Sequence, residues 1–578
     1  MAGPGSGEVR AASGTPGSPG LDALVRALCD PACFPHPLDA PVRVIETHIS
    51  QVLVGGGHAY KLKKPLDLGF LDFGTLERRR ECCELEVRLN RRLAPAIYLE
   101  VVAVCWDGSR ATLVPQGAGA QETAEATGEE ATAVAARGPV VEFAVHMRAF
   151  DPDDLLDRRL AEGRLEPAMI DAVAATIARF HGAIDVAAAG TGFGLPDAVW
   201  APVRANFEAL SKAVRAPGQR AVLAGLARWA RRERRRLAAW FHARRDGGFV
   251  RECHGDLHLG NIAWVDGEPC VFDCIEFNPE LRWTDVAAEV AFTVMDLADR
   301  GRADLGWRLL DAWLAGTGDH GSLPGLRFYL CYRALVRAKV ACLRLAQPQR
   351  DTAATAHLQQ EEEGYVALAA ELSRARPMLV ITHGLSGSGK SRGAAWLLER
   401  IGAVRVRSDV ERKRLAGLCA LDRLGAGGAP DAGLYAAEAT RRTYDRLEAF
   451  ARSALDGGFP VIVDAAFLQR PARERFRLLA ERLQVPFAIL SFDAPAAELR
   501  ARVAARARSG QDASDAGPAI LEHQLATAQP LQPDEGGCTL DIDASAAAAA
   551  GALEAAVHWL AGRAAAPPDA RQHGSAVT

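Results

Sequence analysis

The chain has 578 residues, of which 49% are hydrophobic and 24% are charged, and its formal net charge is −4. This length excludes a single small domain, because one ordinary hydrophobic core does not organise so many residues, and it favours two or three domains. The near-neutral charge excludes a surface that binds polyanions as a whole, so we do not expect a nucleic-acid partner unless a local basic patch supplies one.

The ends of the chain and its cysteines indicate where the protein works. Residues 1–20 are rich in Gly, Pro and Ser and lack a charged segment followed by an apolar one, so we expect a disordered tail rather than a signal peptide. A second disordered tail is expected over 563–578. No apolar run approaches the ~18 residues of a membrane span. The twelve cysteines include no C-x-x-C pair, which predicts reduced thiols. We therefore expect a cytoplasmic protein without a membrane partner.

In the first half of the chain, strands come before helices. Short strands are expected at 42–45, 51–54, 59–63, 140–148 and around Trp264 and Val271. A charged helix is expected over 75–93, and the low-complexity stretch 116–138 is expected to be a surface loop. Helical patterns otherwise dominate up to 372. This order predicts a two-lobed α+β domain over 21–372.

The pattern changes at 372–377, where we place a domain boundary. Four short apolar runs beyond it alternate with helical stretches and are expected to be buried strands: 378–381, 404–407, 460–463 and 487–492. An amphipathic helix is expected over 545–561. Alternation of buried strands with helices predicts an α/β domain with a parallel sheet over 377–562.

Residues 384–391, GLSGSGKS, form a complete G-x-x-x-x-G-K-[ST] motif between an expected strand and an expected helix. Glycines allow backbone N–H groups to approach phosphate oxygens, and the N-terminus of the helix favours the same anion. Lys390 is expected to bridge the β- and γ-phosphates of ATP, and Ser391 to bind Mg²⁺. The other expected phosphate-binding residues are Gly384, Gly387, Ser388 and Gly389. The second domain is therefore predicted to be a P-loop NTPase domain.

Two aspartates and two arginines follow this motif. Asp409 ends the second strand, where it is expected to face the crevice and to accept the proton of a substrate hydroxyl; alternatively, it caps the helix that starts at Val410. Asp464 ends an apolar strand in the Walker B pattern, which predicts a role in holding Mg²⁺. Arg502 and Arg506 lie four residues apart on one helix face and are expected to close over the transferring phosphate, with solvated helix charges as the alternative.

A second phosphate-transfer pattern lies in the first half of the chain. Within HGDLHLGN, residues 254–261, Asp256 and Asn261 are five residues apart, and Asp273 lies twelve residues beyond. In kinase chemistry an aspartate at the first of these positions takes the proton of the acceptor hydroxyl, and the other two groups hold Mg²⁺. We therefore assign Asp256 as base, and Asn261 and Asp273 as metal ligands. His258 is expected to pack or to form a hydrogen bond rather than to catalyse.

The phosphate side of this second site leaves alternatives open. Lys61, on the third expected strand, is the preferred phosphate-binding lysine, but Lys63 points to the same face of the strand. Glu86 is the preferred partner on the following helix, with Glu84 as the alternative. The loop that ends at Ser50 lacks the G-x-G-x-x-G pattern of protein kinases, so phosphate contact there would come from backbone N–H groups and the Ser50 hydroxyl.

The motifs resemble two known groups of kinases. HGDLHLGN with Asp273, and Phe180-His181 upstream, resemble the aminoglycoside phosphotransferase and choline kinase-like group over 40–370. GLSGSGKS, RSDVERKRL and VIVDAAF are similar to small P-loop kinases of the gluconate kinase, zeta-toxin and polynucleotide kinase type. The tandem order resembles a bacterial family in which an aminoglycoside phosphotransferase-like domain precedes an AAA-type or P-loop kinase domain. This resemblance implies a protein-kinase-like fold for the first domain.

The motifs and the resemblance together predict a bifunctional enzyme that transfers the γ-phosphoryl of ATP to hydroxyls of small molecules at two separate sites. A second interpretation is an ATP-binding sensor or regulatory domain beside one catalytic domain, prompted by the glycine-poor loop at Ser50. A third is a nucleic-acid-end kinase, prompted by the arginine-rich stretch 228–245, for which a solvated helix face is the plainer explanation. The sequence determines neither the acceptors nor the oligomeric state.

Overall fold

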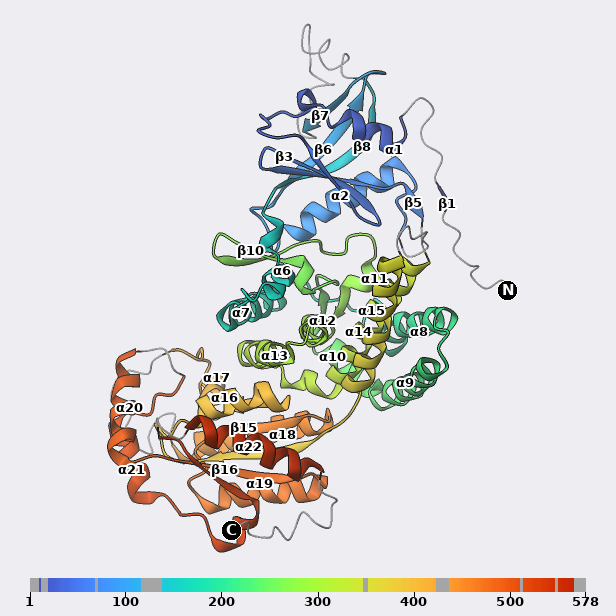
Figure 1. The fold of residues 1–578 in the computed structure, drawn as a ribbon. Coiled ribbons are helices and arrows are strands. Elements are labelled where there is room, and N and C mark those ends of the chain that lie inside the picture. The colour runs from blue at the N-terminus through green and yellow to red at the C-terminus, as the bar shows by residue number, and fades with distance from the viewer. Residues whose placement is uncertain are drawn as a thin grey trace. The chain divides into compact units, whose positions relative to one another are not determined.

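The computed structural model describes residues 10–11, 19–67, 71–115, 138–346, 352–422, 436–509, 513–545 and 549–565 (Figure 1). Its contacts group the chain into two compact units: the first contains Met1–Glu166, Ala183–Gly194 and Gly248–Glu289, and the second contains Pro167–Gly182, Leu195–Gly247 and Val290–Thr578. The expected loop over 116–138 and the expected tails lie largely outside the described residues. The domain boundary at 372–377 stays a prediction, because this grouping follows contacts rather than sequence order.

The first unit is built on a six-stranded antiparallel sheet with the strand order β2-β3-β4-β8-β6-β7. The strands are β2 (Arg43–Glu46), β3 (Ser50–Gly55), β4 (His58–Lys63), β6 (Tyr98–Trp106), β7 (Ala111–Pro115) and β8 (Val140–Arg148). The turn between β3 and β4 contains Gly56 and Gly57, both at positive φ, which glycine adopts at little cost. Neither β6 nor β7 was predicted from the sequence. Five consecutive residues of β6 are buried, which hides the alternation of a half-exposed strand.

Helix α2 (Leu76–Asn90) packs across β6 and β8. It begins after Thr75, whose hydroxyl accepts a hydrogen bond from the N–H of Arg78. Its buried face includes Cys83 and Val87 and also carries Glu86. The shorter elements of the unit are β1 (Arg10–Ala11), α1 (Leu21–Ala27), β5 (Leu66–Asp67), α6 (Leu156–Ala161), β9 (Val250–Glu252), β10 (Ile262–Val265), β11 (Glu268–Val271), α11 (Pro279–Arg282) and β12 (Trp283–Asp285). β10 and β11 form a hairpin, and β9 pairs antiparallel with the distant β12, so the catalytic-loop stretch lies between two short ladders.

Helices make up the first part of the second unit. They are α7 (Pro167–Ala183), α8 (Pro196–Ala213), α9 (Pro217–Arg236), α10 (Ala238–Asp246), α12 (Val286–Asp299, whose first turn belongs to the first unit), α13 (Ala303–Thr317), α14 (Leu323–Leu345) and α15 (Thr352–Leu372). The arginine-rich stretch falls on α9 and α10. Arg231 and Arg235 there are exposed, whereas Arg244 is buried in an ion pair with Asp319. The stretch is thus in part structural rather than one continuous basic surface.

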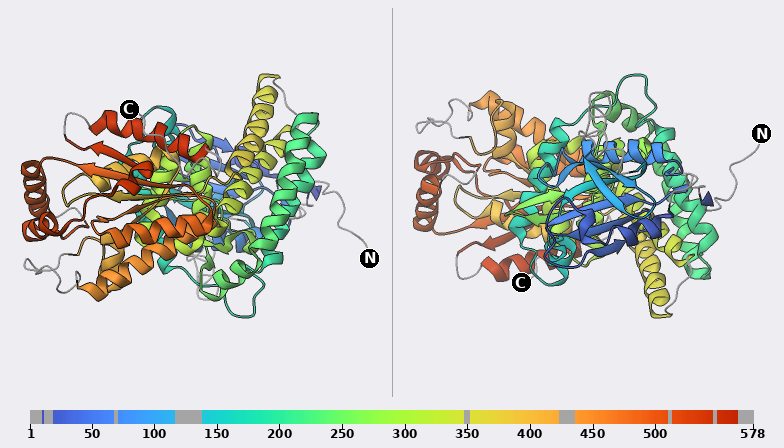
Figure 2. Two further views of the ribbon diagram at one scale, coloured as in Figure 1. Left: turned by 90° about the horizontal axis from the view of Figure 1, so that it is seen from below. Right: turned by 90° about the horizontal axis from the view of Figure 1, so that it is seen from above.

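The rest of the second unit is a five-stranded parallel sheet with the order β14-β15-β13-β16-β17. The strands are β13 (Met378–His383), β14 (Val404–Arg407), β15 (Pro460–Asp464), β16 (Phe487–Asp493) and β17 (Thr539–Asp543). The helices are α16 (Lys390–Ile401), α17 (Ser408–Leu415), α18 (Ala437–Asp456), α19 (Arg470–Leu483), α20 (Ala496–Ser509), α21 (Pro518–Thr527) and α22 (Ala549–Ala565). Figure 2 (left) shows the sheet between the red helix α22 and the orange helices α18 and α19. The predicted α/β P-loop fold is confirmed, and β17 is an additional strand that was not predicted from the sequence.

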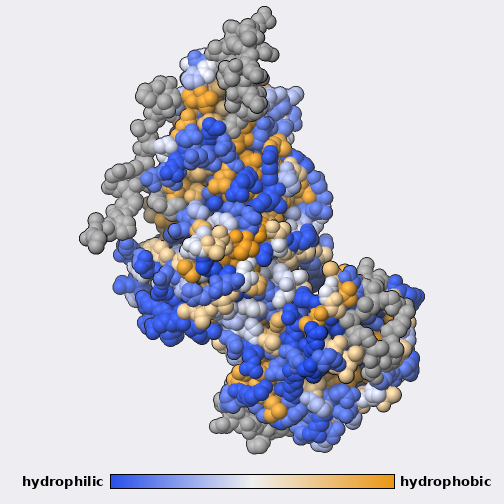
Figure 3. All heavy atoms as spheres, turned by 180° about the vertical axis from the view of Figure 1, so that it is seen from behind, coloured by the Kyte–Doolittle hydropathy of each residue, from blue (hydrophilic) through white to orange (hydrophobic). Residues whose placement is uncertain are grey.

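Many apolar side chains of the described residues are buried in packed cores. A core of strand and helix residues that includes Val380, Leu397, Ile462 and Leu490 lies between the parallel sheet and α16. In the part of the chain that the structure describes, no helix is both long and apolar enough to cross a membrane. Hydrophilic residues cover most of the face drawn in Figure 3.

Candidate active sites

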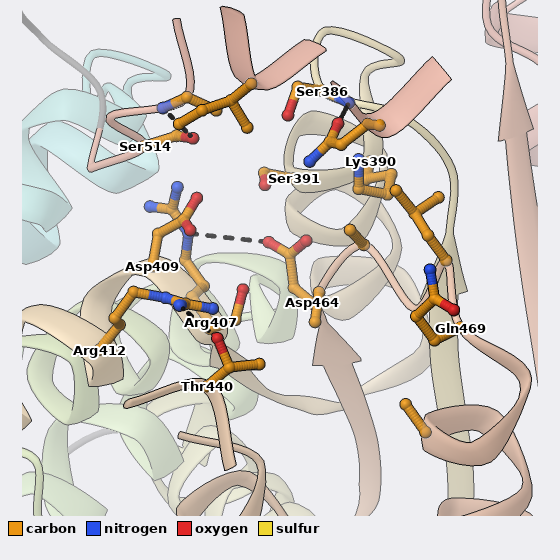
Figure 4. A pocket seen from close by; sticks show the side chains of 18 of the residues that line it. Ser386, Lys390, Ser391, Arg407, Asp409, Arg412, Thr440, Asp464, Gln469 and Ser514 are labelled. Carbon is orange, nitrogen blue, oxygen red and sulfur yellow. Dashed lines mark hydrogen bonds and ion pairs between the residues drawn. The ribbon is translucent and has the colours of Figure 1, made fainter. Parts of the chain in front are cut away.

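The parallel sheet brings the P-loop and two aspartates to one edge. The register pairs Arg407 of β14 with Asp464 of β15, and Val463 of β15 with Ile381 of β13. Because the strands run in the same direction, their carboxyl ends meet, and this is where doubly wound sheets bind ligands. Asp409, two residues beyond β14, and Asp464 line the same cavity as the P-loop (Figure 4).

This cavity has a volume of about 760 Å³, within the range of small-molecule sites. It is lined by the P-loop and by residues of α17, α18, α19, α20 and α21. The predicted site residues on its wall are Gly387, Gly389, Lys390, Ser391, Asp409, Asp464, Arg502 and Arg506. Gly384 and Ser388 are not on this wall, and Ser388 is buried inside the loop.

The backbone of the loop requires glycine at two positions. Gly384 has φ 139°, and a Cβ there would lie 2.3 Å from the carbonyl oxygen of Phe492. Gly387 has φ 85°, and a Cβ there would lie 2.9 Å from the carbonyl oxygen of Leu499. Both positions are closed to other residues by sterics as well as by backbone conformation. This backbone has the glycine conformation that a phosphate cradle requires, in which N–H groups can approach an anion directly.

Lys390 is held inside the loop in a position to meet phosphate. Its Nζ donates to the carbonyl oxygen of Leu385 at 2.7 Å and lies 3.4 Å from Oγ of Ser388. Burial lowers the pKa of Lys390 to about 8, although the nearby Asp464 and Asp409 act in the opposite direction. The ammonium group therefore lacks enough negative charge around it in the free protein, and bound phosphate would supply that charge.

Asp464 fits a metal-side role. It is 4% exposed, and among the described residues no hydrogen bond reaches its Oδ2. Nε of Arg407 lies 3.6 Å from that oxygen, which is an ion pair but not a hydrogen bond. A buried carboxylate oxygen beside a phosphate loop, together with the Ser391 hydroxyl, offers the hard oxygen ligands that Mg²⁺ prefers. Asp464 and Ser391 are therefore suitable ligands for the Mg²⁺ ion that a P-loop fold implies.

The structure distinguishes between the alternative roles predicted for Asp409, Arg502 and Arg506. Asp409 is the second residue of α17 and the N-cap position belongs to Arg407, so the capping interpretation of Asp409 is wrong. An acidic side chain in the first turn is still favoured by the helix dipole. Arg502 donates to the carbonyl oxygens of Gly387 and Ala544, at 3.3 and 2.8 Å. Arg502 and Arg506 therefore line the phosphate side of the cavity rather than lying only in solvent.

We expect the affinity of the P-loop for nucleotide to fall as the pH rises above about 8. Bound phosphate raises the pKa of Lys390 above its value in the free protein. At a pH above the free-protein pKa, nucleotide binding must therefore take up a proton, and the Kd increases by up to about tenfold per pH unit. Calorimetric titration with Mg·AMP-PNP in two buffers of different ionisation enthalpy measures this uptake. Lys390→Arg should flatten the profile. A Kd that stays constant from about pH 7 to about pH 9 would contradict the expectation.

A buried ion pair between β14 and α13 supports the helix that follows the P-loop. Arg405 of β14 binds both carboxylate oxygens of Asp311 in α13, at 3.2 and 2.6 Å, and its Nη1 donates to the carbonyl oxygen of Ser391 at 2.9 Å. The two side chains are only 10% and 14% exposed. A second ion pair, Arg308 to Glu399 at 3.1 Å, joins α13 to α16 without contacting Ser391. Ser391, the last residue of the P-loop motif, is thus positioned through a helix residue, Asp311, that precedes it by about 80 residues in sequence.

Asp311→Asn is expected to weaken the binding of Mg·AMP-PNP about tenfold, because Arg405 loses its charged partner and no longer holds Ser391 in place. The matched control is Glu399→Gln, which removes the ion pair that joins α13 to α16 and should change the Kd by less than about twofold. Both variants are checked by thermal unfolding. Equal losses of affinity in the two variants would assign the effect to helix packing and not to the P-loop.

The kinase-like site lies within the first unit. Nζ of Lys61, on β4, donates to Oε1 of Glu86 at 2.8 Å and also contacts the carboxylate of Asp273. Glu84, the alternative to Glu86, pairs instead with Arg80 at 2.9 Å on the exposed side of α2. Asp273 follows β11 with φ 64°, a conformation that is costly outside glycine and is often found at functional positions. The structure therefore brings Lys61, Glu86 and Asp273 together.

The catalytic-loop residues also meet. Nδ2 of Asn261 donates to the carbonyl oxygen of Asp256 at 2.9 Å and lies 3.3 Å from its carboxylate. The Asp256 and Asp273 side chains are 37% and 45% exposed, so both are open to a ligand. His254 joins the catalytic loop to the segment that carries Asp273, because its Nε2 lies 2.8 Å from the carbonyl oxygen of Phe272. Burial lowers the pKa of His254. His258 accepts the N–H of Gly260, so the expected hydrogen-bonding role is confirmed.

Two residues of this site have positions that the sequence did not reveal. Ser50 is fully buried, and its hydroxyl has no hydrogen-bond partner among the described residues, so its contact with phosphate stays a prediction. Glu276, three residues after Asp273, was missed; it contacts the buried Lys63, whose Nζ also donates to Oε2 of Glu86 at 2.6 Å. Lys63 therefore holds Glu86 through a buried ion pair, while Lys61 contacts both Glu86 and Asp273.

Lys63→Met is expected to destabilise the first unit by about 3–5 kcal/mol, because two buried carboxylates lose their shared cation. Urea unfolding followed by tryptophan fluorescence measures the change. The neighbouring Lys64→Met is the matched control: Lys64 pairs with an exposed Glu46, and its loss should cost less than about 1 kcal/mol. Equal stability of the two variants would contradict the structural role of Lys63.

Comparison with known proteins places the chain in a family. Residues 379–531 match a family model described as an AAA domain. The chain is 30% identical over 493 residues to "Uncharacterized protein Rv2004c" of Mycobacterium tuberculosis (strain ATCC 25618 / H37Rv), with 84% of this chain and 91% of the relative covered. The chain belongs to the family of this mycobacterial protein. A protein of Mycobacterium bovis, Mb2027c, matches to the same extent. Because the alignment is longer than either expected domain, the family shares the tandem arrangement.

The solved structures that are similar to the first or the second part of the chain have low TM-scores. A choline/ethanolamine kinase family protein from Mesorhizobium loti is 12% identical and covers 61% of this chain and 98% of its own, with a TM-score of 0.35. A sugar kinase from Janibacter sp. HTCC2649 is 22% identical and covers 32% of this chain and 95% of its own, with a TM-score of 0.24. At these scores neither similarity bears on function.

Proposed function

We propose that the chain is a bifunctional phosphotransferase that uses ATP and Mg²⁺ at two separate sites and transfers the γ-phosphoryl to hydroxyl groups of small molecules. The observation that carries the proposal is one cavity in which a phosphate cradle, the buried Asp464 and the candidate base Asp409 meet. Such a set contains each part that phosphoryl transfer needs: a cradle, a metal group and a base.

At the P-loop site, Lys390 and the loop N–H groups hold the β- and γ-phosphates. Ser391 and Asp464 would hold Mg²⁺, which neutralises charge on the phosphates when bound. The acceptor hydroxyl oxygen forms a bond to the γ-phosphorus and loses its proton to Asp409. The bond from the γ-phosphorus to the bridging oxygen breaks, and ADP leaves with that electron pair. Arg502 and Arg506 stabilise the charge on the transferring group.

At the kinase-like site, Asp256 is the base, and Asn261 and Asp273 are the candidate metal ligands. Lys61 reaches the phosphates once nucleotide displaces its contact with Asp273, while Glu86 retains the other side of the ammonium group. The hydrogen bond from Asn261 to Asp256, and the exposed side chain of Asp273 beside Lys61, support this assignment. A short separation of base and metal groups is required because the acceptor oxygen and the γ-phosphate must meet in line.

A second candidate function is favoured by one observation. Ser50, whose hydroxyl is the predicted side-chain contact of the expected phosphate-covering loop, is fully buried in the first unit. A kinase-like domain that binds ATP without covering its phosphates would serve as a sensor or regulator of the P-loop site. The two functions differ in whether phosphoryl transfer is lost when Asp256 is replaced.

The experiment is a transfer assay with γ-labelled ATP and a pool of cellular metabolites. Wild-type protein should label at least one acceptor, and the double variant Asp256→Asn/Lys390→Ala should label none. Each single variant then assigns a labelled product to one site. If wild-type protein consumes no ATP with any pool, the proposed function is wrong.

A further inference from the structure

One face of helix α21 lines the cavity beside the P-loop. The wall residues from this helix recur at the three- and four-residue spacing of a single helix face: Ile520, His523, Gln524 and Thr527. Gln524 contacts the P-loop directly, because its Oε1 accepts a hydrogen bond from the backbone N–H of Ser386 at 2.9 Å. Helix α21 therefore places a carboxamide group at the phosphate loop.

Helix α21 is fixed in this position by packing and by a hydrogen bond. A small apolar cluster joins it to α20 and to the P-loop, and its members are Ala494, Leu499, Val503 and Leu521, with Leu385 packed against them. At the end of the helix, Nε2 of Gln469 donates to the carbonyl oxygen of Thr527 at 3.0 Å. The carboxamide of Gln524 is thus positioned by its helix before a ligand binds, so little reorganisation is needed when one does.

Lys390 binds the other end of the peptide group that Gln524 contacts. Nζ of Lys390 donates to the Leu385 carbonyl oxygen at 2.7 Å, and the N–H of the same peptide group, which belongs to Ser386, donates to Gln524. Figure 4 shows Ser386 and Lys390 on the same side of the cavity, across from Asp409. The lysine of a P-loop reaches the β- and γ-phosphates. Gln524 therefore lies at the end of the loop where the γ-phosphoryl group is expected.

The hydrogen bond to Ser386 determines which end of the carboxamide remains for a ligand. A backbone N–H can only donate, so the atom of Gln524 that faces it is the oxygen, and the NH₂ group is the other end. Among the described residues no hydrogen bond reaches Nε2 of Gln524, and the side chain is half-buried on the cavity wall. Because an amide NH₂ group donates twice and does not accept, it suits a phosphate oxygen.

We propose that Gln524 is a further substrate-binding residue of the P-loop site, in which Nε2 donates to an oxygen of the γ-phosphoryl group while Oε1 stays on Ser386. This inference rests on the proposed function of that site. No bond is made or broken at the carboxamide, which remains neutral during the transfer. A fixed neutral donor adds to the stabilisation that Lys390 gives the transferring group. It also distinguishes a nucleoside triphosphate from a diphosphate, which lacks the group that the donor contacts.

The test compares the binding of Mg·AMP-PNP and Mg·ADP to the full chain by calorimetry, so no acceptor is needed. The isotherm that disappears in Lys390→Ala belongs to the P-loop site. Gln524→Glu keeps an oxygen for the Ser386 N–H but replaces the NH₂ group with a second, negatively charged oxygen. We expect it to weaken the binding of Mg·AMP-PNP at least about tenfold and to change the Kd of Mg·ADP by less than about threefold, because only the first ligand carries a γ-phosphoryl group.

Two further variants separate the contact from the packing of α21. Gln524→Leu removes the donor without adding a charge and should weaken the binding of Mg·AMP-PNP about tenfold. Ala526→Glu is the matched control, since it adds a negative charge at an exposed position of the same helix that is not on the cavity wall. It should change neither Kd by more than about twofold.

The outcomes distinguish this contact from the proposed function. Equal changes for the two nucleotides in Gln524→Glu would overturn the contact, because a side chain that only anchors the loop does not discriminate between them. Tighter binding of Mg·AMP-PNP by Gln524→Leu would also overturn it, since the carboxamide would then compete with phosphate for the Ser386 N–H. If the expected Kd changes are found but wild-type protein transfers no phosphoryl group, the contact stands and the proposed function is wrong.

Discussion

Replacing Lys390 with alanine is expected to lower phosphoryl transfer at the P-loop site by about 10²–10³-fold. The substitution removes the one ammonium group that the loop encloses, and no other lysine lies on the described wall of the cavity. The alanine side chain fits the first turn of α16, so the fold should persist. Single-turnover transfer with γ-labelled ATP, in the Asp256→Asn background, measures the loss.

The control for this prediction is Arg392→Ala. Arg392 lies two residues later in α16 and lines the same cavity, but its side chain is exposed. It should retain transfer within about threefold, because a solvated charge contributes little to binding. Comparable losses in both variants would mean that general charge, and not the enclosed ammonium group, supports the reaction.

The second large effect is expected for Asp256→Asn, which should lower transfer at the kinase-like site by about 10²–10⁴-fold. Asparagine has nearly the same shape as aspartate but cannot accept the hydroxyl proton. The hydrogen bond from Asn261 to the backbone carbonyl of residue 256 does not depend on the side chain, so the loop should keep its conformation. Transfer is measured in the Lys390→Ala background with the acceptor identified from the metabolite pool.

Asp266→Asn is the matched control for this variant. Asp266 lies in the turn between β10 and β11, pairs with Arg148, and is 72% exposed. It should leave transfer unchanged within about twofold. If Asp256→Asn behaves like Asp266→Asn with every acceptor, the first unit is not catalytic, and its role as a sensor of ATP becomes the better explanation.

Local patterns predicted much of the fold. β8 and β14 begin and end at the expected residues, because each combines apolar residues with clear flanking turns or charges. β6, β7 and β17 were missed. β17 alternates polar and apolar residues over only five positions, and two of these are aspartates, which are depleted in strands, so its strand signal is weak. Its position is decided by pairing with β16, which is a long-range contact.

The candidate sites were predicted to a different extent. Motif spacing identified Lys390, Asp464 and Asp256 because their chemistry depends on neighbours in sequence. Glu276 and Asp311 were not found, since each acts on a residue far away in the chain: Glu276 contacts Lys63, and Asp311 holds Arg405 behind the P-loop. No local pattern marks a side chain whose partner is set by packing.

The sequence by itself determined that the chain carries two phosphate-handling motifs, a P-loop and a kinase-type catalytic loop, because glycine conformation and metal chemistry constrain residues that are close along the chain. Only the tertiary structure decided which lysine faces the metal-side aspartate, which glutamate pairs with it, and which helix brings Gln524 to the P-loop. These choices depend on which faces of strands and helices meet. Which faces meet is determined by burial and charge pairing across the fold, and residue spacing alone does not determine it.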